Sequence, residues 1–242
     1  MQESDTLKGL VKQKRGQFVL IATLMIAIMI ISIAALLHTA ATYYKHEPWD
    51  EYLTLIGDIE LNSRRLVEIS LANFTNTLNP NILKINMEKW QTDVSKIYSG
   101  RGISLNYTLA NGLYKSVNYF LGLNRSWEKR TSFSAANVTF TLNISSIGLS
   151  GYKFTTVTFL SLKILNVDFT NKEITITVKG EDNKPVTSLK NIEVANATVK
   201  SVSKSYDAQE TLIYIIAYDG NIVQPVKVTV TDLRDIKVIA KY

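Results

Sequence analysis

The side chains best suited to chemistry are few, and their spacing assembles no catalytic site. The sequence contains two histidines, His38 and His46, and no cysteine. A chain without cysteine has no thiolate nucleophile, no disulfide and no cysteine-ligated metal. Two histidines without a third clear ligand do not predict a zinc site, and no Gly-x-Ser-x-Gly, P-loop, Rossmann glycine or HExxH pattern occurs. We therefore expect no catalytic residues, no cofactor and no metal.

Clustered carboxylates offer two further kinds of chemistry. Residues 181–183 read Glu-Asp-Asn, whose oxygens are suited to calcium. Gly180 and Pro185 frame them, and this framing favours a hairpin turn. Asp232 and Asp235 are interpreted as turn or edge residues. A glycosidase needs two facing carboxylates; the sequence alone does not exclude such a pair, although a thin antiparallel sandwich offers no obvious cleft.

The chain also carries groups suited to covalent or surface modification. Six Asn-x-Ser/Thr sequons follow the apolar segment described below, and each is a glycosylation acceptor if it is exposed outside the cell. Their asparagines are Asn73, Asn106, Asn124, Asn137, Asn143 and Asn196. Trp127 lies in the polar stretch 124–130, where a tryptophan is difficult to bury, so it is a candidate surface contact.

A long apolar run precedes these groups, and it is the first element expected to position them. Phe18 to Leu37 contains no charge, and its only polar residues are Thr23 and Ser32. As a helix, 20 residues rise about 30 Å, which matches a bilayer core, and both hydroxyls are able to bond back to their own helix. Four cations precede the run and one closely follows it, which predicts a cytoplasmic N-terminus. The alternatives are a cleaved signal peptide, which usually has a shorter apolar region, and a buried core helix.

Residues 14–17, Lys-Arg-Gly-Gln, directly precede this run. They resemble the processing site of archaeal type IV prepilins, whose class III signal peptides are cut after the glycine by a prepilin-type peptidase. The resemblance implies Arg15 and Gly16 before the cut and Gln17 as the new N-terminus. It also implies that the apolar helix is kept, first as a membrane anchor and then as the core of a filament of like subunits.

The resemblance covers about residues 8–40, and two positions depart from the family pattern. The family often has serine two residues after the glutamine and glutamate two residues beyond that, where this chain has Val19 and Ile21. The glutamate pairs with a neighbour's amino terminus during assembly, so its absence makes the expectation of filament formation weaker than that of processing.

Composition is consistent with a globular exterior segment. The 242 residues are 46% hydrophobic and 20% charged, with a net charge of +6. Lysines are scattered beside acids and no dense basic run follows the N-terminus, so we expect surface charge and no nucleic-acid partner.

Two helices are expected after the anchor, followed by strands. Apolar residues near helical spacing predict one helix after Pro48 and a second after Asn79-Pro80, ending at Gly100 and Gly102. Residues 111–123 fit either helix or strand. From residue 103 onward the period is otherwise two, with one wet face at 138–144. The other strand candidates are 155–168, 173–179, 192–203, 211–218, 226–231 and 236–240.

These elements predict an α+β chain with a long N-terminal transmembrane helix, a helical hairpin and an antiparallel β-sandwich of immunoglobulin-like architecture. We divide it into a cytoplasmic basic leader (1–16), a transmembrane helix (17–44), an extracytoplasmic helical hairpin (45–102) and a β-rich sandwich (103–242). The resulting hypothesis is a pilin-like structural or adhesive surface subunit whose partners are the lipid bilayer, like subunits and the prepilin-type peptidase. The alternatives are an unprocessed tethered accessory or sensory subunit that binds a partner through its ectodomain, and a tethered enzyme.

Overall fold

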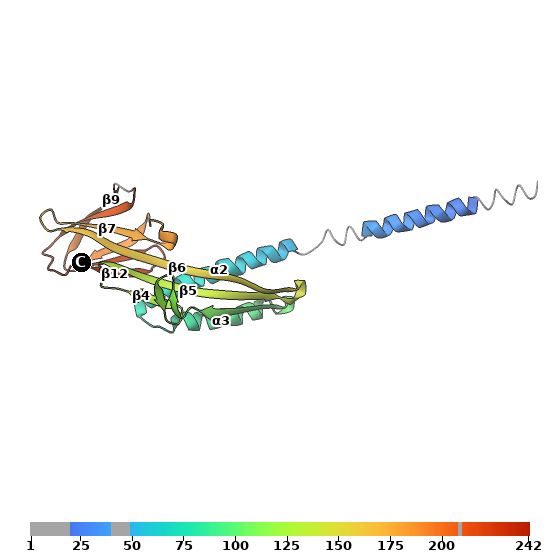
Figure 1. The fold of residues 1–242 in the computed structure, drawn as a ribbon, viewed down its shortest axis with the longest axis horizontal. Coiled ribbons are helices and arrows are strands. Elements are labelled where there is room, and N and C mark those ends of the chain that lie inside the picture. Colours follow the sequence, from blue (N-terminus) through green and yellow to red (C-terminus); the bar gives the residue numbers. More distant parts are fainter. Residues whose placement is uncertain (1–19, 40–48, 208–209) are drawn as a thin grey trace, which may run out of the picture. The chain divides into compact units, whose positions relative to one another are not determined.

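The computed structural model describes residues 20–39, 49–207 and 210–242. It divides into two compact units, Met1–Gly57 and Asp58–Tyr242, which are described separately. The described part of the first unit contains the apolar helix Leu20–Thr39 and the beginning of α2. The second unit contains the rest of the chain, and it has the α+β architecture with antiparallel sheets that the sequence predicts (Figure 1).

The predicted helical hairpin is present. Helix α2 spans Trp49–Thr77 and α3 spans Ile82–Ile97. The Asn79 side chain accepts a hydrogen bond from the Asn81 N–H at 3.0 Å, just before α3 begins. After α3, a short 3₁₀ turn ends at Gly102, whose φ of 63° is one that glycine adopts at little cost.

The packed face of the hairpin contains part of the predicted apolar stripes and two serines. Of the apolar residues at helical spacing, Ile59 of α2 and Val94 of α3 are buried, whereas Ile69, Ile85 and Ile97 are exposed. The hairpin also buries the small Ser63 and Ser70 of α2, which accept hydrogen bonds from the Trp90 indole and the Asn86 amide of α3 at 2.9 Å each. Small hydroxyl residues let the two helices approach closely while keeping these polar groups bonded.

Twelve strands lie in the described chain, all paired antiparallel. They are β1 (Ile103–Leu109), β2 (Gly112–Tyr114), β3 (Val117–Tyr119), β4 (Leu123–Ser126), β5 (Thr131–Ile144), β6 (Leu149–Asp168), β7 (Glu173–Lys179), β8 (Leu189–Val194), β9 (Thr198–Tyr206), β10 (Leu212–Asp219), β11 (Lys227–Asp232) and β12 (Lys237–Lys241). The large sheet has the order β1-β5-β6-β7-β10-β9, and β4 also pairs with β5. A second sheet has the order β12-β11-β8, while β2 and β3 pair as a hairpin. The ambiguous stretch 111–123 is therefore mostly strand.

Three details differ from the strand predictions. The stretch 192–203 is not one strand, because the chain turns at Asn196 (φ 62°) and passes from β8 in the small sheet to β9 in the large one. The strand predicted at 155–168 begins earlier, because the turn after β5 is complete at Ser145–Ile147 and β6 already begins at Leu149. The strands are also not uniformly short, because β5 has 14 residues and β6 has 20.

One face of the β5–β6 pair carries both of the other layers. Near the β5–β6 turn, Tyr152 donates from its hydroxyl to Glu60 of α2 at 2.6 Å. Farther along the same face, Ser134 donates to the Lys237 carbonyl of β12 at 2.7 Å. Helices therefore cover one half of these strands and the three-stranded sheet covers the other half, as Figure 1 shows. We call these the turn half (138–144 and 149–157) and the far half (131–136 and 158–168).

Candidate functional site

The apolar helix Leu20–Thr39 is the only helix of the described residues that is long and apolar enough to cross a membrane, a property that anchors and signal sequences share. Both predicted back-bonds are present, from Thr23 to the Leu20 carbonyl at 3.0 Å and from Ser32 to the Ile28 carbonyl at 2.8 Å. The hydroxyls are thereby satisfied within the helix. The processing residues Arg15, Gly16 and Gln17 lie outside the described residues, as do His46 and the predicted ends of the span at 17–19 and 40–44.

The aliphatic side chains of this helix are exposed around its whole circumference. Twelve large apolar residues, among them Leu20, Met29 and Leu37, each expose at least 50% of their surface. Full burial of such a side chain is worth about 1.5–3 kcal/mol. A helix that is apolar on every side is suited to lipid or to other helices and poorly suited to water.

A groove of about 710 Å³ lies in the second unit, beside the turn half of β6. Residues 155–157 and Phe159 of β6 line it, together with Arg64 of α2. The β2–β3 hairpin contributes Tyr114, Lys115, Val117 and Tyr119. The segment 181–183 also lines the groove. Because the groove is open and half apolar, its shape fits an extended segment or a flat ligand better than an enclosed small molecule.

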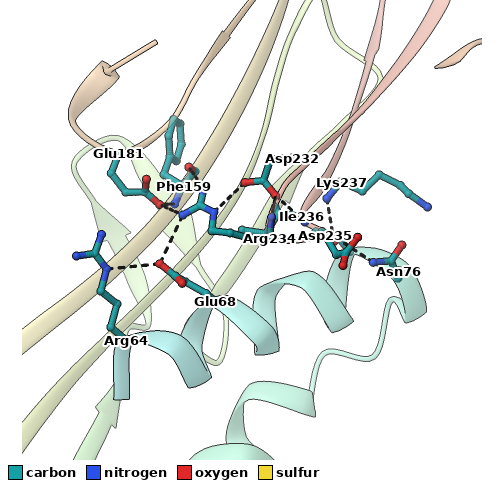
Figure 2. Close-up of polar contacts among 11 residues, drawn as sticks. Arg64, Glu68, Asn76, Phe159, Glu181, Asp232, Arg234, Asp235, Ile236 and Lys237 are labelled. Atoms are coloured by element: carbon teal, nitrogen blue, oxygen red, sulfur yellow. Dashed lines mark hydrogen bonds and ion pairs between the residues drawn. The ribbon is translucent and has the colours of Figure 1, made fainter. Parts of the chain in front are cut away.

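Arg234 holds the end of this groove together. Its guanidinium bonds Glu181 at 2.6 Å and Asp232 at 2.8 Å, and its Nη1 lies 3.7 Å from Glu68 Oε1 of α2 (Figure 2). Glu181 also accepts the Phe159 N–H of β6 at 3.0 Å. One arginine thus joins α2, β6, the 181–183 turn and the β11–β12 turn, an arrangement that we call the Arg234 cluster.

The electrostatics of the Arg234 cluster keep its charges fixed. Burial alone would raise the pKa of Glu181, but the hydrogen bonds from Phe159 and Arg234 outweigh it and hold the pKa below the ordinary value of 4.5. Burial would lower the pKa of Arg234, and the carboxylates Glu181 and Asp232 raise it instead. Glu181 is therefore an ionised structural partner, which differs from the raised pKa of a general acid.

The segment 181–183 forms the predicted turn. Gly180 donates its N–H to the Lys184 carbonyl at 2.8 Å, and Lys184 donates to the Glu181 carbonyl at 3.1 Å. Asp182 and Asn183 have positive φ values of 56° and 58°. Among residues 20–39, 49–207 and 210–242, no group of three His, Asp or Glu side chains is placed to hold a metal ion.

The turn predicted around Asp232 and Asp235 is also present, and it docks on α2. Asp232 accepts the N–H groups of Arg234 and Ile236 at 2.9 and 3.0 Å. Asn76 of α2 donates to the Asp235 carbonyl at 3.1 Å. Sequence reasoning missed Arg234 itself, because an isolated arginine between two aspartates has no distinguishing spacing.

The six sequon asparagines have different surroundings. Asn73, Asn106 and Asn196 are exposed, and Asn124 is half-buried. Asn137 is only 4% exposed, so in the folded chain it does not meet the exposure that a glycan needs. Asn143 is half-buried and its Oδ1 accepts the Gly151 N–H at 2.7 Å, which ties together the β5–β6 turn.

Trp127 is half-buried, and its polar atom is satisfied. Its indole N–H donates to Ser134 at 3.0 Å, and the Arg125 guanidinium lies 5.0 Å from its ring centroid. The residue therefore has an intramolecular role in joining β4 to β5, and its role as a surface contact stays a prediction.

Comparison with protein-family models, with curated proteins and with solved structures finds no match for this chain. The function is therefore argued from the geometry of its two units.

Proposed function

We propose that this chain is a structural subunit of the cell surface, anchored by its N-terminal helix and displaying residues 58–242 outside the cell. One observation carries the proposal: the helix Leu20–Thr39 exposes apolar side chains around its whole circumference and bonds its own hydroxyls. Such a helix is stable in a bilayer core or in the apolar centre of a helical assembly. The basic residues before it favour a cytoplasmic N-terminus.

The pilin-like part of the proposal rests on residues 14–17. Processing after Gly16 would leave Gln17 as the first residue and would keep the apolar helix. Like subunits would then associate through this helix, whose exposed Leu and Ile side chains suit helix–helix packing.

The exterior unit is proposed to be a sandwich of immunoglobulin-like architecture. The small sheet buries Val228, Val230, Val238 and Ala240 completely, and β12 contacts both β5 and β6. Two antiparallel sheets that face each other through alternating apolar residues form a sandwich core. Its role is display and contact, and we propose no catalytic residue in it.

Two measurements on the full chain test the proposal. After cell lysis, the protein should sediment with membranes and require detergent for extraction, and N-terminal sequencing of the mature protein should begin at Gln17. A Gly16→Leu variant should retain Met1 and remain in the membrane. Full-length protein soluble without detergent would overturn the anchor, whereas an intact Met1 in the natural protein would favour the unprocessed accessory subunit.

A further inference from the structure

The turn half of β6 has a main-chain edge without a partner in the described chain. Strand β6 pairs with β5 from Leu149 onward, but it pairs with β7 only from Ser161 to Asp168. Between these limits, only Phe159 has main-chain groups occupied on that edge: its N–H donates to Glu181, and its C=O accepts from Arg234 at 3.5 Å. Residues 149–157 therefore pair on one side alone, and the groove described above lies along this edge.

The direction of the unpaired groups follows from two hydrogen bonds. The Ile164 N–H points toward β5, where it donates to the Arg130 carbonyl, whereas the Phe159 N–H points away from β5. Because successive residues alternate and the register from 152 to 162 is regular, odd-numbered residues point outward. The N–H and C=O groups of Lys153, Thr155 and Val157 consequently face the groove.

The opposite boundary of the sheet has the same property. Strand β1 pairs only with β5 among the described strands. Ala110 donates its N–H inward to the Asn137 carbonyl of β5 at 3.2 Å, so even-numbered residues of β1 point inward and odd-numbered ones point outward. Leu105, Tyr107 and Leu109 thus present their main-chain groups at this second edge.

The free edges of β6 and β1 run in the same direction and lie at the same level along β5. Phe140 of β5 pairs with Tyr107 on one side and with Phe154 on the other, and Val138 likewise pairs with Leu109 and Thr156. Since β1 and β6 are both antiparallel to β5, they run in the same direction. Two copies side by side with one orientation and no axial shift would bring residues 149–157 of β6 in one copy against β1 of the next. The pairing ends there, because the next copy's β4 comes level with Phe159 and Ser161, which are already bonded to Glu181 and paired with Lys179, and β4 must lie out of the sheet plane at that point.

We propose that neighbouring copies of this chain join in this way, with β6 of one copy pairing in parallel with β1 of the next. The inference rests on the proposed function, because copies anchored in one membrane share orientation and height. At zero shift Thr155 faces Thr108, and its N–H and C=O reach Tyr107 and Leu109 of the neighbour. This is the alternation that a parallel ladder requires, and a slip of one residue would break it.

Side-chain chemistry favours pairing at the free edges of β6 and β1 over pairing at the free edge of β9. The free edge strand β9 carries Lys200 and Lys204, and charged residues on an edge discourage pairing. By contrast, β1 has no charge, and the free edge of β6 (149–157) carries a single one, Lys153. Open strands with few charges are templates for strand addition.

Charges on the helical face of the two edges are complementary. Arg64 of α2 lines the β6 groove, with its side chain 60% exposed. Glu88 of α3 lies close enough to β1 that, after burial, its charge raises the pKa of Tyr107. Within one copy these side chains already have ion-pair partners, Glu68 at 3.4 Å for Arg64 and Lys84 at 3.8 Å for Glu88, which a pair between copies would replace. The exposed hydrogen bond from Gln91 to Asn106 gives way to the ladder, and a glycan on Asn106 would stand on the sheet face and not in the plane of the main-chain bonds.

Cysteine cross-linking tests the contact directly, because the natural chain contains no cysteine. Full-length Thr155→Cys and Thr108→Cys chains with different tags are co-expressed in one membrane and oxidised. Paired strands lie about 4.8 Å apart, within disulfide reach. We expect a mixed disulfide dimer in at least tenfold excess over that from Thr155→Cys with Ser203→Cys, which is an exposed control on β9.

A second experiment tests the main-chain hydrogen bonds of the proposed ladder. Thr155→Pro removes an outward N–H, and it should reduce cross-linking between Lys153→Cys and Asn106→Cys chains at least fivefold, while Thr155→Val should not. Homodimers of Thr155→Cys alone would indicate antiparallel pairing and overturn the proposal. Absence of the mixed dimer from chains that are membrane-bound and start at Gln17 would also overturn it, and it would leave the proposed function intact.

Discussion

The two halves of the β5–β6 pair are built differently. In the far half, β6 pairs with β5 as far as Lys163 and with β7 from Ser161 to Asp168, and Arg234 ties the neighbouring turn to α2. In the turn half, the same strand has one free edge beside a groove, and helices provide the cover. Strand β6, with 20 residues, thus lies in a closed core at one end and has an open edge at the other. A closed core and an open main-chain edge are therefore separated along one continuous strand.

The largest effect is expected from the core of the turn half. Phe140 is 1% exposed and stacks on Phe154 with ring centroids 5.0 Å apart. Phe140→Ala should lower the free energy of unfolding by about 3–5 kcal/mol, because it removes buried area and leaves a cavity. Urea unfolding of the full chain in detergent, followed by tryptophan fluorescence, measures this. Phe169→Ala, at a residue 44% exposed, should change it by less than about 1 kcal/mol; equal losses would show that the turn half has no packed core.

The next effect concerns the Arg234 cluster. Arg234→Leu leaves Glu181 and the nearly buried Asp232 without their cation, and we expect a loss of about 2–4 kcal/mol in the free energy of unfolding. Lys190→Leu removes the exposed ion pair with Asp235 and should cost under about 1 kcal/mol in the same assay. A small effect at Arg234 would mean that α2 and the far half are held together by apolar packing alone.

Proline substitutions compare the two edges of β6 directly. The main-chain groups of Ser161 and Thr155 both point outward, but on that side Ser161 pairs with Lys179 of β7, whereas Thr155 pairs with no strand of the described chain. Ser161→Pro should cost about 2–3 kcal/mol through a lost ladder bond and an unsatisfied carbonyl. Thr155→Pro should cost less than about 1 kcal/mol, since edge strands tolerate proline. Thermal unfolding of both variants in parallel decides whether the edge at Thr155 is free.

The smallest effect is a dependence on pH. Because the pKa of Glu181 is lowered in the folded chain, its contribution to stability is fully present above its ordinary value of 4.5 and is lost as pH falls through the lower folded value. Unfolding midpoints should therefore fall more steeply below about pH 4.5 for the natural chain than for Glu181→Gln. Asp182→Asn, at the adjacent turn position, should keep the steep dependence. An equally steep fall in Glu181→Gln would assign the effect to other acids.

Local patterns predicted some elements well and others poorly. The apolar helix, the helical hairpin and the strand at 138–144 follow from unbroken periodicity in the sequence. The stripe on α2 was predicted only in part: Tyr52 and Ile59 are buried and Ile69 is exposed, and the buried face includes Ser63 and Ser70, which a search for large apolar residues passes over. The break at Asn196 was missed since residues on both sides of it favour strand and only the change of sheet requires the turn.

The sequence by itself determined where the apolar helix lies, because twenty uncharged residues in a row have one favourable environment and need no distant partner. It also determined which residues of most strands face the core, since alternation is a local property. Only the tertiary structure decided which strands pair, which edges stay open and that Arg234 meets Glu68 and Glu181, residues far from it along the chain. Such contacts depend on how distant segments pack, and no spacing within a single segment encodes them.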